Sequence, residues 1–265
     1  KNVTMILNYY EKGSRFDYTK LIQRGLADLE FNNTIIFKIL ISIARTIQKM
    51  HNRQIIHGDL KLANILIDKN FDPAVSDFGL SMNKNQKKIQ TGGTPNYMAP
   101  EVITNGEISE KADVYSFGII MFELFTGQFA YESFLKNDSD YIKLQRKICD
   151  ENYRPEFNVQ LKKPARNLIE RCWSQNPNER PDFDEILDLL INNNVDDNGE
   201  CKFLDGVEMD LIEIFVEKIF VETDPIELFI DQLNRLKREI QLYHQYSQFN
   251  KEEKVAPTFF SSETA

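Results

Sequence analysis

Cysteine is scarce in this sequence, with three residues in 265 (Cys149, Cys172 and Cys201) and no C-x-x-C pair. This spacing excludes a disulfide scaffold, argues against a structural zinc site, and favours a reducing, cytoplasmic compartment. Glycine and proline are also few, at eleven and nine residues, which excludes collagen-like and low-complexity chains. Because 42% of the residues are hydrophobic, the chain can bury a substantial core.

Long apolar runs are missing as well. The two best candidates, residues 35–44 and 117–125, fall short of the roughly 18 residues that a membrane span needs, and they contain Lys38 and Glu123. We therefore expect no membrane segment. The first residues, Lys1–Thr4, have neither the features of a signal peptide nor an initiator methionine.

Basic residues are fewer than acidic residues, and the difference lies in one region of the chain. The formal net charge is −9, from 32 basic and 41 acidic residues, which argues against binding to nucleic acid or to an anionic membrane. Residues 1–193 hold 25 residues of each sign, whereas residues 194–265 hold 16 acidic and 7 basic residues. The polar stretch 191–199 lies at this change and ends in glycine. We expect one domain over residues 1–193 and an acidic, helical C-terminal extension over residues 194–265.

Hydrophobic periodicity predicts a mainly helical body with a few short strands. The expected strands are the apolar runs Ile65–Ile67 and Ala74–Ser76, which are separated by turn residues. The helix after Asp113 is apolar on nearly all sides and should be buried. The predicted helices are Thr34–Asn52, Asp113–Thr126, Pro164–Ser174 and Phe183–Ile191.

Four polar residues lie around the two predicted strands. Asp59, Lys61 and Asn64 lead into the first strand, and Asp77 follows the second. Two carboxylates, an amide oxygen and an ammonium group on neighbouring loops suit phosphoryl transfer. Oxygen ligands hold Mg²⁺, the lysine neutralises phosphate charge, and the second carboxylate orients or deprotonates an attacking hydroxyl.

Five motifs in order resemble those of eukaryotic protein kinases. They are His57–Asn64 (catalytic loop), Asp77–Gly79 (magnesium motif), Gly93–Glu101 (end of the activation segment), Asp113–Gly118 (start of the central helix) and Arg180-Pro181. The resemblance covers roughly residues 3–193. It implies an α+β protein-kinase fold, here a mainly α C-terminal lobe with short β hairpins. Within the family, Lys61 and Thr94 favour Ser/Thr specificity. The tyrosine-kinase-like group of Ser/Thr kinases has sequences similar to Asp113–Gly118, Cys172-Trp173 and Arg180–Phe183.

The resemblance also implies roles. Asp59 corresponds to the catalytic aspartate, Lys61 contacts the γ-phosphate, and Thr94 bonds to both and selects a Ser/Thr acceptor. Asn64 and Asp77 correspond to the Mg²⁺ ligands. The expected cofactors are ATP and Mg²⁺, and the expected substrate is a protein with a Ser or Thr acceptor.

The start of the chain resembles the hinge between kinase lobes. On that alignment the backbones of Asn8 and Tyr10 bond the adenine of ATP, and Leu66 forms the floor beneath it. No Gly-rich loop occurs in the chain, so we expect the small lobe to lie upstream or to be missing and the chain alone to be weakly active. Gly58 stands where the family usually has an arginine that grips a phosphorylated activation loop.

Other features have structural interpretations. We expect Asp113 to clamp the backbone of the catalytic loop, Glu101 and Arg180 to form a structural ion pair, and His57 to pack in the core. A pseudokinase that acts as a scaffold is the alternative to an enzyme. In the tail, Val207–Val221 and a heptad-like seam from Phe229 to Tyr243 predict two helices. We expect these helices to pack on the kinase body or on each other. The alternative is that they mediate partner binding or self-association through residues 204–248.

Overall fold

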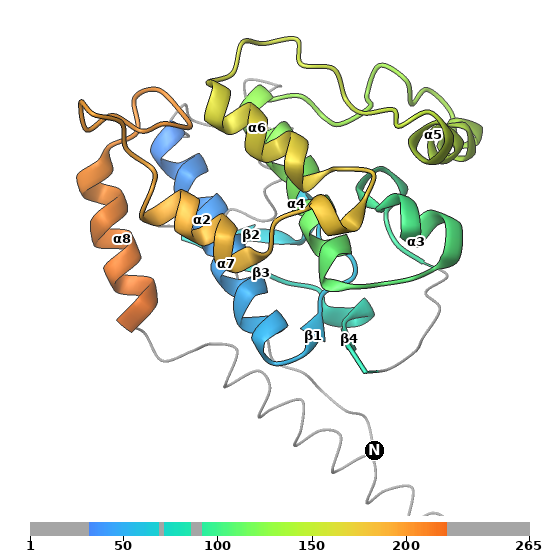
Figure 1. Ribbon diagram of the computed structural model, residues 1–265, viewed down its shortest axis with the longest axis horizontal. Helices are drawn as coiled ribbons and strands as arrows, with labels where there is room; N and C mark the ends of the chain where they lie inside the picture. Colours follow the sequence, from blue (N-terminus) through green and yellow to red (C-terminus); the bar gives the residue numbers. More distant parts are fainter. Residues whose placement is uncertain (1–31, 69–71, 86–91, 222–265) are drawn as a thin grey trace, which may run out of the picture. The chain divides into compact units, whose positions relative to one another are not determined.

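The structure is a computed structural model that describes residues 32–68, 72–85 and 92–221. Within these ranges the chain is mainly helical, as predicted, and the strands are short (Figure 1). The α-helices are α2 (Asn33–Asn52), α3 (Pro100–Asn105), α4 (Glu110–Thr126), α5 (Asp138–Asp150), α6 (Lys163–Cys172), α7 (Phe183–Ile191) and α8 (Met209–Val221). The 3-10 helices are η1 (Leu62–Asn64), η2 (Phe78–Leu80), η3 (Pro95–Tyr97) and η4 (Pro177–Glu179).

Helix α2 begins and ends where its sequence provides caps. The Asn32 side chain accepts a hydrogen bond from the Ile35 amide at 3.1 Å, which satisfies one of the free donors of the first turn. The helix ends before Gln54, which has a φ of 60°. Its isoleucines recur with the helical period, so one face of α2 is buried against α4 and α7.

Helix α4 is the centre of the core, as its all-round apolar sequence predicted. It packs against α6 and α2 (Figure 1). Gly118 allows the close approach of α6, because a Cβ at this position would lie 2.9 Å from Cys172 Cβ. Cys172 and Trp173 are buried in the same contact, so both pack in the core. Gly127, with a φ of 69°, ends the helix in the left-handed conformation that favours glycine.

The strands form two antiparallel pairs. β2 (Ile65–Ile67) pairs with β3 (Pro73–Val75) in the register Ile65 to Val75, which confirms the predicted hairpin. β1 (Ile55–Ile56) pairs with β4 (Met82–Asn83). β1 and β2 flank the loop of residues 57–64, and their partners β4 and β3 flank Asp77, so the two pairs join these segments. This arrangement holds the two functional loops together.

Residues 194–221 pack on the body of the domain. The buried Thr34 hydroxyl accepts a hydrogen bond from the Glu208 amide at 2.9 Å, at the start of α8. Phe203 lies against Phe37 of α2, with ring centroids 6.0 Å apart. Phe215 is buried beneath Lys38, whose Nζ lies 5.5 Å from its ring centroid. The alternative in which the start of the tail packs on the kinase body is thus confirmed for these residues.

The chain divides into two compact units, Lys1–Val221 and Glu222–Ala265. The predicted boundary after residue 193 stays a prediction, although residues 194–221 belong to the first unit. The seam expected from Phe229 to Tyr243 lies outside the described residues. Across the described ranges, none of the helices combines the length and the apolar character needed to cross a membrane.

Candidate active site

Asp113 anchors the backbone of the loop between β1 and β2. Its carboxylate accepts hydrogen bonds from the backbone amides of His57 and Gly58, each at 2.9 Å, and from Nε2 of His51 at 2.8 Å. Burial alone would raise the pKa of the Asp113 carboxyl, but the hydrogen bond and charge of His51 and its other donors bring it below the ordinary value. Asp113 is therefore the predicted backbone clamp, and His51 is its side-chain partner.

Gly58 has a φ of 78°, a conformation that glycine adopts without steric penalty. The loop turns here, so that the amides of His57 and Gly58 both point toward Asp113. Glycine therefore allows this backbone conformation without strain, and no side chain projects from the residue that Asp113 binds.

His57 is a fully buried core residue, as predicted. Its Nδ1 accepts a hydrogen bond from the Asp59 amide at 3.3 Å, and its Nε2 lies 3.3 Å from the Ser76 carbonyl oxygen. A neutral imidazole protonated on Nε2 satisfies both contacts. Burial lowers the pKa of His57, which agrees with the neutral form. The ring also packs on Phe78, with centroids 5.4 Å apart.

Asp59, Lys61 and Thr94 form a closed polar triangle at the surface of the loop. Lys61 Nζ donates to Asp59 Oδ2 at 2.5 Å and to Thr94 Oγ1 at 2.9 Å. The amide and the hydroxyl of Thr94 lie 3.2 and 3.1 Å from Asp59 Oδ1. Three hydrogen bonds thus orient one carboxylate, across 35 residues of sequence. The three predicted catalytic residues are brought together, while their roles stay predictions.

Asn64 and Asp77 lie at the same, open end of the β2–β3 hairpin, Asn64 just before β2 and Asp77 just after β3. The Asn64 carbonyl accepts from the amide and hydroxyl of Ser76, at 2.8 and 2.9 Å, so the neighbour of Asp77 is bonded to Asn64. The Asn64 side chain donates through Nδ2 to the Asp59 carbonyl at 2.8 Å, and its Oδ1 remains as an acceptor. Asp77 is exposed and has a φ of 60°, with Oδ1 accepting from the Gly79 amide at 3.3 Å.

These donors fit Mg²⁺ better than they fit a transition metal. Among the described residues no group of three or more His, Cys, Asp and Glu side chains could hold a metal ion. One amide oxygen and one carboxylate are enough for Mg²⁺, which keeps waters and takes further oxygens from phosphates.

Of the residues predicted to contact adenine, Leu66 is half-buried in β2 opposite Ala74. Asn8 and Tyr10 lie outside the described residues.

The segment after Thr94 is fixed to α4 by contacts that the sequence did not reveal. The buried Tyr97 hydroxyl donates to Glu123 Oε2 at 2.5 Å, and the Ser116 hydroxyl donates to the Tyr97 carbonyl at 2.8 Å. Burial, and then the charge of Glu123, raise the pKa of Tyr97 well above its ordinary value, so it stays a donor. A small cavity lies between this segment and Leu60. The sequence signal for this arrangement was an acidic residue, Glu123, within the otherwise apolar run of residues 117–125.

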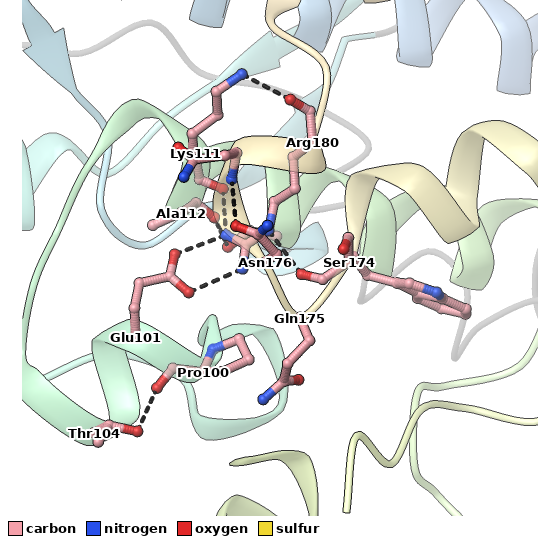
Figure 2. Close-up of polar contacts among 12 residues, drawn as sticks. Pro100, Glu101, Thr104, Lys111, Ala112, Ser174, Gln175, Asn176 and Arg180 are labelled. Atoms are coloured by element: carbon pink, nitrogen blue, oxygen red, sulfur yellow. Dashed lines mark hydrogen bonds and ion pairs between the residues drawn. The ribbon is translucent and has the colours of Figure 1, made fainter. Parts of the chain in front are cut away.

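Arg180 and Glu101 form the predicted ion pair (Figure 2). The guanidinium is fully buried, and it also donates to the backbone carbonyls of Ser174 at 2.9 Å and Lys111 at 2.8 Å. Lys111 Nζ in turn donates to the Arg180 carbonyl at 2.7 Å. This network joins α3, α4 and the loop before α7. It holds the end of the segment that begins at Thr94.

The protein kinase domain family matches residues 1–189 of this chain. The chain belongs to the protein kinase family. Dual specificity protein kinase shkD of Dictyostelium discoideum is 37% identical over 192 residues, which cover 69% of this chain and 25% of that protein. Serine/threonine-protein kinase STY46 of Arabidopsis thaliana is 34% identical over 205 residues, covering 76% of this chain and 34% of that protein.

Dual specificity protein kinase shkA of Dictyostelium discoideum is 41% identical over 145 residues, covering 52% of this chain and 27% of that protein. The chain thus spans about a third or less of the length of these three relatives. The kinase fold expected from the five motifs is confirmed by the family match. Asp59 and Asp77 lie in the two motifs that resemble the family's catalytic and magnesium loops, and Thr94 contacts Asp59.

Proposed function

We propose that this chain provides the catalytic loop, the magnesium loop and the acceptor side of a protein Ser/Thr kinase, which transfers the γ-phosphoryl group of ATP to a protein hydroxyl. The observation that supports it best is the triangle of Asp59, Lys61 and Thr94. A carboxylate that had lost its catalytic role would not need three side-chain and backbone donors to orient it beside an ammonium group. A pseudokinase scaffold is the rival that the experiment below must exclude.

In this proposal each side chain has one task. Asp59 accepts or orients the proton of the substrate hydroxyl, because Thr94 and Lys61 hold its two oxygens in place. Lys61 offsets the negative charge that develops on the transferred phosphoryl oxygens. Thr94 positions both groups through one hydroxyl, which accepts from Lys61 and donates to Asp59.

Asn64 and Asp77 would hold Mg²⁺ through Oδ1 of the amide and the carboxylate, since both lie at the same end of the hairpin. When bound, Mg²⁺-ATP supplies the phosphoryl group and the neutralisation of its charge. Asn8, Tyr10 and Leu66 would contact adenine. The protein's own contribution is to place the donors before ATP arrives, through the bonds of Asn64 to Asp59 and of Ser76 to Asn64.

The acceptor is proposed to be Ser or Thr in a protein. Thr94 and Lys61 favour this choice, and the name of STY46 specifies a serine/threonine kinase, whereas shkD and shkA are named dual specificity kinases. We further propose a cytoplasmic location, from the cysteine pattern, and a helix-mediated partner or self-association through residues 204–248. Nucleic acid and membranes are not among the proposed partners.

The test is transfer of labelled phosphate from ATP to a generic protein substrate by the protein expressed from its whole gene. Asp59→Asn removes the proton acceptor while keeping the shape of the side chain, so transfer should fall by about 10²- to 10⁴-fold. Thr94→Val should reduce it by about tenfold, whereas Thr94→Ser retains the hydroxyl and should stay close to wild type. Equal transfer by wild type and Asp59→Asn would favour the scaffold. Phosphoamino-acid analysis of the product separates Ser/Thr from dual specificity.

A further inference from the structure

A groove lies between α7 and α8, away from the catalytic loop. Its volume is about 350 Å³, within the range of sites that take a small molecule or the anchor side chains of a peptide. The walls are apolar and come from Leu187 and Ile191 on α7 and from Val216 and Phe220 on α8. Phe220 is 47% exposed, which is unusual for a phenylalanine that lines a folded domain.

The floor of the groove is polar and ordered. Arg45 of α2 lies over the Phe220 ring, with its guanidinium carbon 3.9 Å from the ring centroid. It donates to Gln48 Oε1 at 2.8 Å, and Gln48 Nε2 donates to Asp184 Oδ1 at 2.5 Å. This chain of contacts fixes the position of Phe220 relative to α7. The groove is therefore built by the packing of α8, and not by chance exposure of one ring.

Both rims of the groove are acidic. Asp184 and Asp188 stand on the α7 side, and their carboxylates accept hydrogen bonds from the neutral side-chain amides of Gln48, Asn192 and Asn193. On α8, Glu213 and Glu217 are exposed, and helical spacing puts them on the same side as Val216 and Phe220. In the described ranges no ion pair neutralises any of the rim carboxylates Asp184, Asp188, Glu213 and Glu217. Among the described residues that line the groove, Arg45 on its floor is the one cation.

We infer that this groove docks a basic amphipathic helix of a partner protein. Its apolar side chains would enter between α7 and α8, and its lysines or arginines would meet the carboxylates of the two rims. A third helix suits the site because both walls are helices and their side chains form a trough rather than a strand edge. A second copy of this chain is disfavoured, since the chain carries a net charge of −9 and would bring like charge to the rim.

The site shares no residue with the triangle of Asp59, Lys61 and Thr94, so it goes beyond the proposed kinase activity. Its test does not use catalysis, and failure of one proposal leaves the other in place. The docking helix would hold a substrate or regulator on the kinase through α8. The groove would recognise a helix that carries positive charge on both sides of a narrow apolar stripe.

The test is fluorescence anisotropy of labelled peptides titrated with the full chain. One peptide is an amphipathic helix of leucine and lysine, and its partner has the same leucine pattern with glutamate in place of lysine. The basic peptide should bind at least about tenfold more tightly, a difference that shrinks as salt is raised. Binding of the two peptides with equal affinity, or of neither, would overturn the inference.

Two variants with the same change of charge locate the binding. Val216→Lys puts an ammonium group in the groove wall, and Leu211→Lys puts one on the other side of α8, where Leu211 is 41% exposed. Val216→Lys should weaken binding by about tenfold or more, and Leu211→Lys by less than about twofold. Thermal unfolding establishes that both variants fold. An equal effect of the two variants means non-specific attraction and contradicts the inference.

Other occupants would produce different results. If a second copy filled the groove, sedimentation would show self-association that Val216→Lys abolishes, and the basic peptide would not bind. If the chain's own residues after 221 filled it, the peptide would bind only after their removal. Either result overturns a partner helix as the occupant of this groove.

Discussion

The Arg180 guanidinium forms a two-point ion pair with the Glu101 carboxylate, with nitrogen–oxygen distances of 2.7 and 2.9 Å. The two residues are 79 positions apart in sequence, yet they join the end of the activation segment to the loop before α7. The Arg180 side chain is fully buried, and that of Glu101 is 14% exposed. Removing one partner would therefore leave the other charge desolvated.

Glu101→Gln should lower the free energy of unfolding by about 3 to 5 kcal/mol, because the buried guanidinium loses its counter-charge. The measurement is urea unfolding followed by circular dichroism. Glu170→Gln is the matched control, since it breaks an exposed pair with Arg166 at 2.8 Å and should change stability by less than about 0.5 kcal/mol. Equal stability of the two variants would contradict a structural role for the pair.

His57 should make the stability of the domain depend on pH. Burial lowers its pKa in the folded state, so below its ordinary value of 6.5 the unfolded chain takes up a proton that the folded chain does not. Stability should therefore fall as the pH decreases from about 7 to 5, by at most about 1.4 kcal/mol per pH unit from this group. Unfolding by urea at a series of pH values measures it.

His57→Gln removes the titrating group but retains side-chain hydrogen-bonding capacity toward Ser76. The variant should be less stable than the wild type at pH 7, and the difference should shrink as the pH falls toward 5. A difference that stays constant over this range would show that His57 titrates alike in both states, against the neutral tautomer inferred from its contacts with Asp59 and Ser76.

Phe215→Ala tests whether α8 is integral to the kinase domain. Phe215 is buried against α2 beneath Lys38, so its truncation should lower the unfolding free energy by about 3 to 5 kcal/mol. Ile214→Ala, one position away and 63% exposed, should cost less than about 0.5 kcal/mol. Differential scanning calorimetry measures both. If Phe215→Ala left the main transition unchanged, α8 would be a peripheral attachment.

The predicted helices were found because their periodicity is strong. Residues 34–52 and 183–191 each have apolar residues at helical spacing, and α2 and α7 match these ranges within one residue at each end. Helix α5, from Asp138 to Asp150, was not predicted. Its sequence is polar, so it lacks a clear apolar periodicity. The helix begins at a capping box of Asn137 and Asp140, but in the sequence these residues are equally typical of a turn.

The site was predictable in its residue types but not in its connections. Asp59, Lys61, Asn64 and Asp77 could be named from their spacing, because phosphoryl transfer needs those groups. Their partner Thr94 could be named too, from the resemblance to kinases. The supporting contacts of His51, Ser76 and Tyr97 could not, because these are ordinary residues in the sequence and their partners are set by tertiary structure. Hydrogen bonds across 12 to 62 residues leave no local pattern in the sequence.

Local chemistry was enough to establish the family, the mainly helical character of the described residues and the acidic character of the tail, and to predict the active-site side chains. Those properties depend on which side chains follow one another, and periodicity and motif spacing record them directly. The packing of residues 194–221 on α2, and the groove that this packing creates beside α7, depend on which faces meet across more than 170 residues. Such contacts are set only in the tertiary structure. The hydrophobic effect is non-directional, so an apolar face gains from burial against any complementary surface, and the sequence does not specify which surface that is.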